Sequence, residues 1–281
     1  MKVIVWWCLL TLPVICSGQA DTVVHIILRT KVKTTVLSVG DQRKVSTPSS
    51  SAGIVLNNLP GAVPSANLFE GSFFTMPMLA EKTLDVKGYP ASTTVQLLML
   101  RDEQSVGQCT GSMVAPNLVL TAAHCLIDQS SREEDYDAII VAAAGENRVN
   151  GGVLVSRARS AYVLKRHLDN KSQVDIMLLE LEDPIGDQTG WVGITSDTGN
   201  INHSLFHKFS FPAKALDISI TNSHGRQLHY NYGKIGFVDQ DIVGIPNAVN
   251  ANATPGQSGS SFLLMRHDSC YSIGVSVYSR K

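Results

Sequence analysis

The most telling part of the sequence is Cys109-Thr-Gly-Ser-Met-Val-Ala-Pro-Asn-Leu-Val-Leu-Thr-Ala-Ala-His-Cys125. Its apolar residues are typical of a buried strand, which runs into small residues and then into His124. Because the small neighbours carry little bulk, the backbone can pack closely beside the imidazole and hold it where a general base could work. A single histidine is more often structural, and these flanking residues are what favour a functional role for His124.

Cysteines add a constraint to the same stretch. The chain has five, and two of them, Cys8 and Cys16, lie near the N-terminus. Of the others, Cys109 and Cys125 are 16 positions apart across a hairpin-like segment, which suits a disulfide in an oxidising compartment. Closing such a loop contributes about 3 kcal/mol to stability. Cys270 is then free, or it pairs with another molecule.

The N-terminus has the features of a secretory signal peptide. Lys2 precedes an apolar run from Val3 to Cys16, and small residues follow the run. The run is shorter than the roughly 20 residues that a membrane-spanning helix needs, and no later segment is long and apolar enough to span. We therefore expect a signal peptide at residues 1–20 and a secreted, extracellular protein without a membrane span.

Composition excludes some classes of protein. The 281 residues include 23 Lys and Arg against 24 Asp and Glu, a formal net charge of −1. A nucleic-acid binder or a binder of anionic membranes would normally show a basic excess, so we expect neither partner. With 44% hydrophobic and 17% charged residues, the chain can bury a sizeable core and is not disordered as a whole.

Changes in the pattern of apolar residues and in the Pro and Gly content divide the rest of the chain. Residues 21–42 alternate apolar and polar side chains, which predicts short strands, and a Ser/Pro/Gly cluster at 45–53 indicates a linker. Residues 54–87 contain scattered Pro and Gly and show no sustained period. We interpret residues 21–87 as a propeptide or N-terminal extension, and residues 88–281 as the main domain.

Short apolar stretches broken by turns fill this main domain. They predict an all-β barrel or sandwich. The stretches are Thr94–Leu100, Ser112–Leu120, Ala138–Ala144, Val153–Val163, Asp175–Leu181, Ser210–Phe211, Leu216–Thr221, Ile235–Val238, Ser261–Met265 and Ser272–Val277.

Two more motifs could carry chemistry. Asp175 stands at the head of an apolar stretch, where a carboxylate must be paired or hydrogen-bonded unless it is simply exposed before the strand. Ser258 lies at the centre of a turn bracketed by Gly256 and Gly259. Such glycines permit unusual backbone angles and leave the N–H groups of Gly256 and Ser258 unobstructed, as an oxyanion hole requires. Taken alone, this turn could also be an ordinary Ser/Gly loop.

Together, in the order His124, Asp175, Ser258, these motifs resemble the trypsin/chymotrypsin family of serine endopeptidases. Thr121-Ala-Ala-His-Cys125 is a specific match, and Gly256-Gln-Ser-Gly-Ser260 is similar to the Gly-x-Ser-Gly-Ser of the glutamyl-endopeptidase branch. The resemblance implies a chymotrypsin-like fold of two antiparallel, six-stranded β-barrels. Few residues follow Ser258, so the second barrel is expected to be incomplete unless neighbouring segments or another chain close it.

The resemblance also implies the role of each residue. Ser258 is the nucleophile, His124 the general base, Asp175 the group that orients His124, and the N–H groups of Gly256 and Ser258 the oxyanion hole. The substrate would be a protein or peptide, and protein inhibitors are expected partners. No metal or organic cofactor is implied. His203 and His207 have a metal-ligand spacing, but they lack a Glu partner and a helical context.

Three positions depart from the family pattern. Asn252 stands where trypsin-type enzymes have the acid of the specificity pocket, so cleavage after Lys or Arg is not expected. Ser276 stands where glutamyl endopeptidases have a histidine, which leaves a glutamate preference open. Gln257 replaces the aspartate that pairs with a new N-terminus in trypsin-type zymogens. If a propeptide is removed, maturation should therefore not use that ion pair.

Sequons for N-glycosylation occur at Asn170, Asn202 and Asn252. The first two lie in polar stretches and are glycosylation candidates on a secretory route. A glycan on Asn252 would interfere with substrate, so we discount it. Two other functions stay open at this point: a catalytically inactive or truncated homologue that acts as a binding module, and an esterase that uses the same triad.

Overall fold

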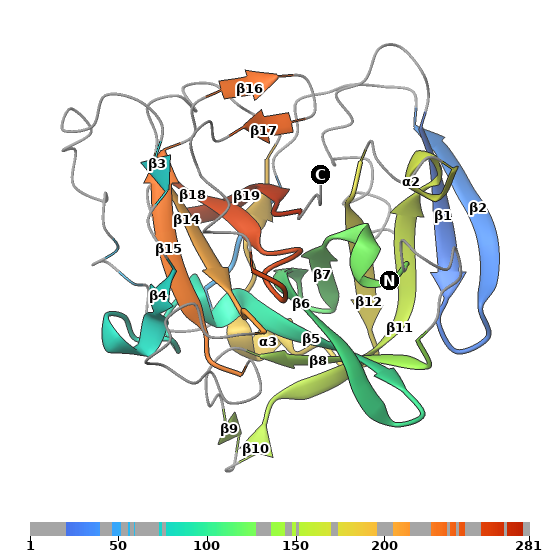
Figure 1. Cartoon of the computed structure of the whole chain (residues 1–281), viewed down its shortest axis with the longest axis horizontal. Helices are drawn as coiled ribbons and strands as arrows, with labels where there is room; N and C mark the ends of the chain where they lie inside the picture. The colour runs from blue at the N-terminus through green and yellow to red at the C-terminus, as the bar shows by residue number, and fades with distance from the viewer. Residues whose placement is uncertain are drawn as a thin grey trace.

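Six antiparallel strands close into a barrel in the first half of the domain (Figure 1). The closure comes from the last strand, which pairs with strands on both of its sides. The six strands are β5 (Thr94–Arg101), β6 (Gln104–Ala115), β7 (Leu118–Thr121), β8 (Ala138–Ala143), β11 (Val155–Leu164) and β12 (Met177–Leu181). Alternate residues point inward, as Val95, Leu97 and Met99 of β5 do, and these form one hydrophobic core.

The computed structural model describes residues 21–39, 47–51, 56, 59, 73–74, 77–127, 136–143, 148–149, 152–169, 174–195, 205–213, 226–234, 237–239, 242–244, 254–266 and 269–277. The expected signal peptide, the expected strand at Leu216–Thr221 and part of the one at Ile235–Val238 lie outside these ranges.

The second half of the domain forms another sheet, in the order β13-β19-β18-β14-β15-β3. Its strands are β3 (Phe73–Phe74), β13 (Gly193–Ile194), β14 (Leu205–Ser210), β15 (His229–Lys234), β18 (Ser261–Arg266) and β19 (Ser269–Val275), and β4 (Met78–Leu79) also pairs with β15. Two small ribbons, β9 (Arg148–Val149) with β10 (Gly152–Val153) and β16 (Phe237–Asp239) with β17 (Ile242–Gly244), stand apart. The all-β, chymotrypsin-like prediction is confirmed as one closed barrel plus a second sheet.

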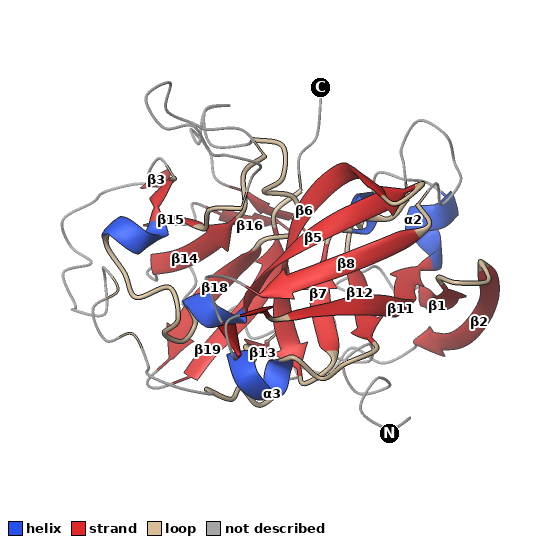
Figure 2. Cartoon of the chain, turned by 90° about the horizontal axis from the view of Figure 1, so that it is seen from below, coloured by secondary structure: helices blue, strands red, loops and turns tan. Residues whose placement is uncertain are grey.

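Helices are short (Figure 2). They are η2 (Ala80–Lys82), η3 (Ala91–Thr93), η4 (Ala123–Cys125), α2 (Lys165–Asp169) and α3 (Gly186–Thr189). In the ranges given above, no helix has the length and apolar character that crossing a membrane requires.

One expected strand was wrong in its bounds. The stretch Ser112–Leu120 is the end of β6 and most of β7, separated by a turn at Pro116 and Asn117. Proline lacks the N–H that a strand ladder needs, and asparagine favours turns. The two strands fold back on each other, with Ser112 opposite Leu120.

Residues before the main domain also belong to these layers. The strands expected near the N-terminus are present as a hairpin, β1 (Asp21–Ile27) and β2 (Val32–Val39), and β1 pairs with β11 of the barrel. Ile26 is fully buried in the barrel core, and Leu59, Ala80 and Leu84 lie in a second core together with Phe209 and Tyr230 of the other sheet. The segment expected to be a propeptide or extension thus contributes to both cores.

We predict that Ile26→Ala lowers the free energy of unfolding by about 2–5 kcal/mol, because it leaves a cavity where a fully buried side chain was. Ile27→Ala is the matched control, since its side chain is 38% exposed and should cost less than about 1 kcal/mol. Chemical denaturation of both variants measures the difference. Equal effects would contradict the packing of β1 on the barrel.

Candidate active site

His124 and Asp175 are brought together by strand pairing. His124 lies in η4, just after β7 ends at Thr121, and Asp175 lies just before β12 begins at Met177. β7 and β12 run antiparallel with Thr121 opposite Met177, so the end of one strand meets the start of the other. The small residues expected to let the backbone pack here, such as Ala123, are fully buried.

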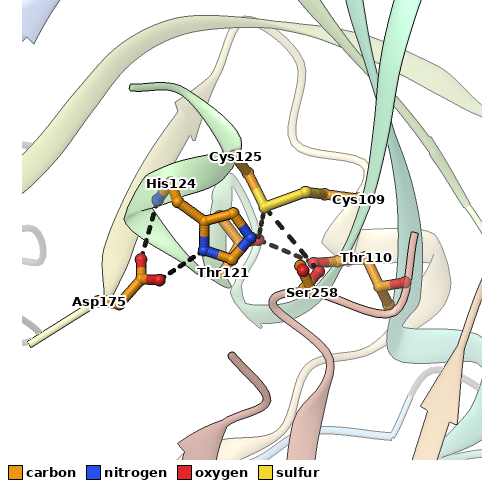
Figure 3. A network of polar contacts seen from close by, with 7 residues as sticks. All are labelled: Cys109, Thr110, Thr121, His124, Cys125, Asp175 and Ser258. Carbon is orange, nitrogen blue, oxygen red and sulfur yellow. Dashed lines mark hydrogen bonds and ion pairs between the residues drawn. A yellow bond between two sulfur atoms is a disulfide. The ribbon is translucent and has the colours of Figure 1, made fainter. Parts of the chain in front are cut away.

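The Asp175 carboxylate holds His124 by two contacts (Figure 3). One oxygen accepts the backbone N–H of His124 at 2.8 Å, and the other lies 2.5 Å from Nδ1 of the ring. This pair fixes the orientation of the imidazole and places a proton on Nδ1. The other ring nitrogen, Nε2, is then the one that can accept a proton.

The charge state of Asp175 suits this role. Burial raises the pKa of the carboxyl, but the hydrogen bonds and charge of His124 outweigh burial, so the pKa lies below its ordinary value. Asp175 is therefore ionised at neutral pH and can stabilise a positive charge on the ring.

The loop that carries Ser258 comes from the second sheet and docks on the first barrel. The backbone N–H of Thr110, in β6, donates to the carbonyl of Ser258 at 2.8 Å, and the Thr110 hydroxyl donates to the carbonyl of Gly256 at 2.7 Å. Thr121 donates in turn to the carbonyl of Thr110 at 2.8 Å. These contacts bring Ser258 to the turn that carries His124 (Figure 3).

No hydrogen bond between the Ser258 hydroxyl and the imidazole is present among the contacts of the described residues. Sγ of Cys125 is near both residues: it lies 3.9 Å from the Ser258 carbonyl oxygen and within 4.8 Å of a ring nitrogen of His124. Catalytic hydrogen bonds are often long in unliganded enzymes and tighten with substrate.

The backbone of the loop leaves two donors open. Gly256 has a φ of +91° and Gly259 a φ of +82°, which side chains other than glycine rarely adopt. The N–H of Gly259 is bonded to the carbonyl of Ser276 at 2.7 Å. Within the described part of the chain, the N–H groups of Gly256 and Ser258 have no acceptor. These are the two donors expected to form the oxyanion hole.

The cysteines at this site have a structural role. Cys109 and Cys125 form a disulfide that ties β6 to η4. These two sulfurs and a nitrogen of His124 form the one cluster of potential metal ligands found in the described ranges, and bonded sulfurs are not available as thiolates. Cys270 is a buried free thiol whose pKa is raised by burial. His207, from the spacing considered above, is within hydrogen-bonding distance of the Tyr230 hydroxyl.

Gln257 stands where trypsin-type zymogens have the aspartate that pairs with a new N-terminus. Both ends of its side-chain amide form hydrogen bonds. Its side-chain N–H donates to the Ser210 hydroxyl at 3.1 Å, and its side-chain oxygen accepts the backbone N–H of Thr254 at 3.1 Å. The loop is thus held by neutral hydrogen bonds. The sequons at Asn170 and Asn202, and Asn252, lie outside the described residues.

Sequence reasoning missed Thr110 and Lys208. Thr110 follows Cys109 directly and is fully buried, yet a threonine in a strand gives no sign that it braces a loop far away in the chain. Lys208 is the one charged Lys, Arg, Asp or Glu residue of β14 and stands between Phe206 and Phe209, and a charge in such a stretch is a signal that could have drawn attention to it.

A family model described as Trypsin matches residues 85–281. A glutamyl endopeptidase of Bacillus licheniformis is 24% identical over 120 residues, covering 43% of this chain and 36% of that protein. An extracellular metalloprotease of Bacillus subtilis is 30% identical over 107 residues, covering 37% of this chain and 33% of that protein. The matches therefore span about a third of the length of these curated relatives.

A solved structure of Glu endopeptidase in complex with MPD has the same fold. It has a TM-score of 0.51 and 18% sequence identity, and the match covers 74% of this chain and 85% of that one.

We predict that Gly259→Ala destabilises the protein by about 3 kcal/mol or more, because the new Cβ would lie 2.0 Å from Oγ1 of Thr121 and 2.3 Å from the carbonyl oxygen of Thr110. Gly274→Ala is the matched control: its Cβ would meet nothing within 4 Å, so the cost should stay below about 1 kcal/mol. Thermal unfolding compares the two. A Gly259→Ala protein as stable as the control would show that the loop does not dock as described.

Proposed function

The chain belongs to the trypsin family, and from this we propose that it is a serine endopeptidase in which Ser258, His124 and Asp175 form the catalytic triad. The observation that carries the proposal is the meeting of the oriented imidazole of His124 with a loop from the other sheet that presents Ser258 and two free backbone N–H groups. An acyl-transfer reaction needs all three parts in one place.

The proposed first half of the reaction forms an acyl-enzyme. Oγ of Ser258 attacks the carbonyl carbon of the scissile peptide bond, and Nε2 of His124 accepts the hydroxyl proton. The oxygen of the tetrahedral intermediate carries a negative charge, which the N–H groups of Gly256 and Ser258 stabilise; one such donor is typically worth about 3 kcal/mol. His124 then gives the proton to the leaving amine as the carbon–nitrogen bond breaks.

The second half repeats the same steps with water. Nε2 of His124 takes a proton from a water molecule, which attacks the ester carbonyl. The intermediate collapses, the proton returns to Oγ of Ser258, and the carboxylic acid product leaves. Asp175 stabilises the charged ring each time, because its own carboxyl is ionised at neutral pH.

We extend the proposal to the secretion and processing of the protein. Residues 1–20 would direct secretion, and Asn170 and Asn202 would be glycosylated. A Cys109–Cys125 disulfide suits an oxidising compartment. Residues 21–87 would remain with residues 88–281 as an extension, since β1 pairs with β11 and contributes to the barrel core. Peptides or proteins would be the substrates, and protein inhibitors would be partners at the same site.

A fluorophosphonate, which reacts covalently with activated serines, tests the proposal. We expect the purified secreted chain to be labelled at Ser258, as read by mass spectrometry of the labelled peptide, and Ser258→Ala to be unlabelled. Asp175→Asn should slow peptide hydrolysis by about 10⁴-fold, because the amide cannot hold the Nδ1–H tautomer. A folded wild-type chain that resists the probe would be a binding homologue, and one that hydrolyses esters but no peptides would be an esterase.

The contacts of Gln257 lead to a prediction about activation. Since Gln257 holds the loop through Ser210 and Thr254, activity should not require a free hydrophobic N-terminus. A chain with two extra residues placed before its mature N-terminus should react with the fluorophosphonate within about twofold of the unextended rate. A much slower reaction of the extended chain would mean that a new N-terminus is needed after all.

A further inference from the structure

Lys208 is a buried cation without an anionic partner among the described residues. It lies in β14, its side chain is 4% exposed, and Nζ donates to the hydroxyl of Ser276 at 3.2 Å. The ring of Phe262 lies 6.0 Å from Nζ. A buried charge is costly unless it is paired, and one hydroxyl and one aromatic face meet only part of what an ammonium group requires.

The amine is still charged near neutral pH. Burial lowers the pKa of Lys208 to about 8, so the protonated form predominates at pH 7. A carboxylate that reached Nζ would replace part of the lost solvation and find a charged partner in a site with little competing water.

Ser276, which accepts the hydrogen bond from Lys208, lies directly beside the nucleophile loop. The backbone N–H of Ser276 donates to the carbonyl of Ser260 at 2.8 Å, and the N–H of Gly259 donates to the carbonyl of Ser276 at 2.7 Å. The residue that contacts Nζ is therefore bonded to the two residues that follow Ser258.

A second hydrogen bond, between Ser210 and Gln257, joins β14 to the nucleophile loop. Ser210 is two residues after Lys208, so the two side chains share a face of the strand. The Ser210 hydroxyl accepts a hydrogen bond from Gln257, the residue before Ser258. The face of β14 that carries Lys208 therefore also contacts the nucleophile loop through Ser210.

Open space borders Ser276. Gly274 is the second-last residue of β19 and stands two residues before Ser276, which directly follows the strand. A Cβ on Gly274 would meet no atom within 4 Å, and Ser276 itself is partly exposed. A substrate side chain that lies beside the nucleophile loop can therefore approach the Ser276 hydroxyl, with the amine of Lys208 directly behind it.

We propose that Lys208 and Ser276 determine specificity by binding the carboxylate of an acidic substrate side chain, that of the residue that contributes the scissile carbonyl. The Ser276 hydroxyl accepts a hydrogen bond from Nζ and can donate a hydrogen bond of its own to the carboxylate, so each group is satisfied at once. The proposal rests on the peptidase function proposed above. It supplies the positive charge from β14, although Ser276 stands where glutamyl endopeptidases have a histidine.

Two peptidyl diphenyl phosphonates test this, identical except for a final side chain of glutamate or glutamine. The pair differs in charge and hardly in shape. We expect the wild-type protein to react at least tenfold faster with the glutamate probe, and Lys208→Met to lower that ratio to below twofold. The matched control is Lys165→Met, which removes an exposed lysine of α2 that pairs with Asp169, and it should keep the wild-type ratio.

Because the ratio compares two probes on one protein, it does not depend on how much of a variant is folded. If Lys208→Met fails to fold, Ser276→Asp serves instead: its carboxylate would pair with Nζ and should lower the ratio at least tenfold. A ratio near one in the wild type, or a glutamate preference that survives these substitutions, rejects the role of Lys208.

The fluorophosphonate separates this inference from the function on which it rests, since that probe carries no peptide side chain. A wild-type protein that reacts with it but shows no glutamate preference keeps the proposed peptidase function and loses the proposed role of Lys208. A folded protein that does not react with it at all rejects both.

Discussion

The site depends on the contact between Thr110 and the loop of Ser258. The proposed triad is shared by two sheets, and no single chain segment fixes its parts relative to one another, so a non-local contact must do so. Thr110 is fully buried and donates twice, to the carbonyls of Ser258 and Gly256, while its hydroxyl also accepts the N–H of Phe211. A single residue of the barrel therefore positions the nucleophile loop and the strand end beside it.

That contact also explains the glycines of the loop. Gly259 lies so close to Thr121 and Thr110 that any side chain would separate the loop from the barrel. With φ values that favour glycine on both sides of Ser258, the backbone turns sharply, and the N–H groups of Gly256 and Ser258 have no acceptor in the described part of the chain. Close packing and free donors are thus two results of the same residue choice.

The sequence predicted the local parts of the structure better than the contacts between distant parts. His124, Asp175 and Ser258 stand in motifs whose neighbours are informative, and the strands of the barrel were predicted from short apolar stretches broken by turns. The pairing of β1 with β11 could not be predicted, because alternation reveals a strand and not its partner. Lys208 could not be assigned either, since a lysine is usually solvated and only the fold shows that its amine meets Ser276.

The Cys109–Cys125 disulfide lies within 4.8 Å of the imidazole and joins the turn of His124 to the strand that carries Thr110. A protease is a hazard to the cell that makes it. If this cross-link were reduced, the turn that carries His124, the proposed general base, would lose its covalent tether to the strand that holds the Ser258 loop. The redox state of the surroundings would then act as a safeguard, because the site would keep this tether only under oxidising conditions.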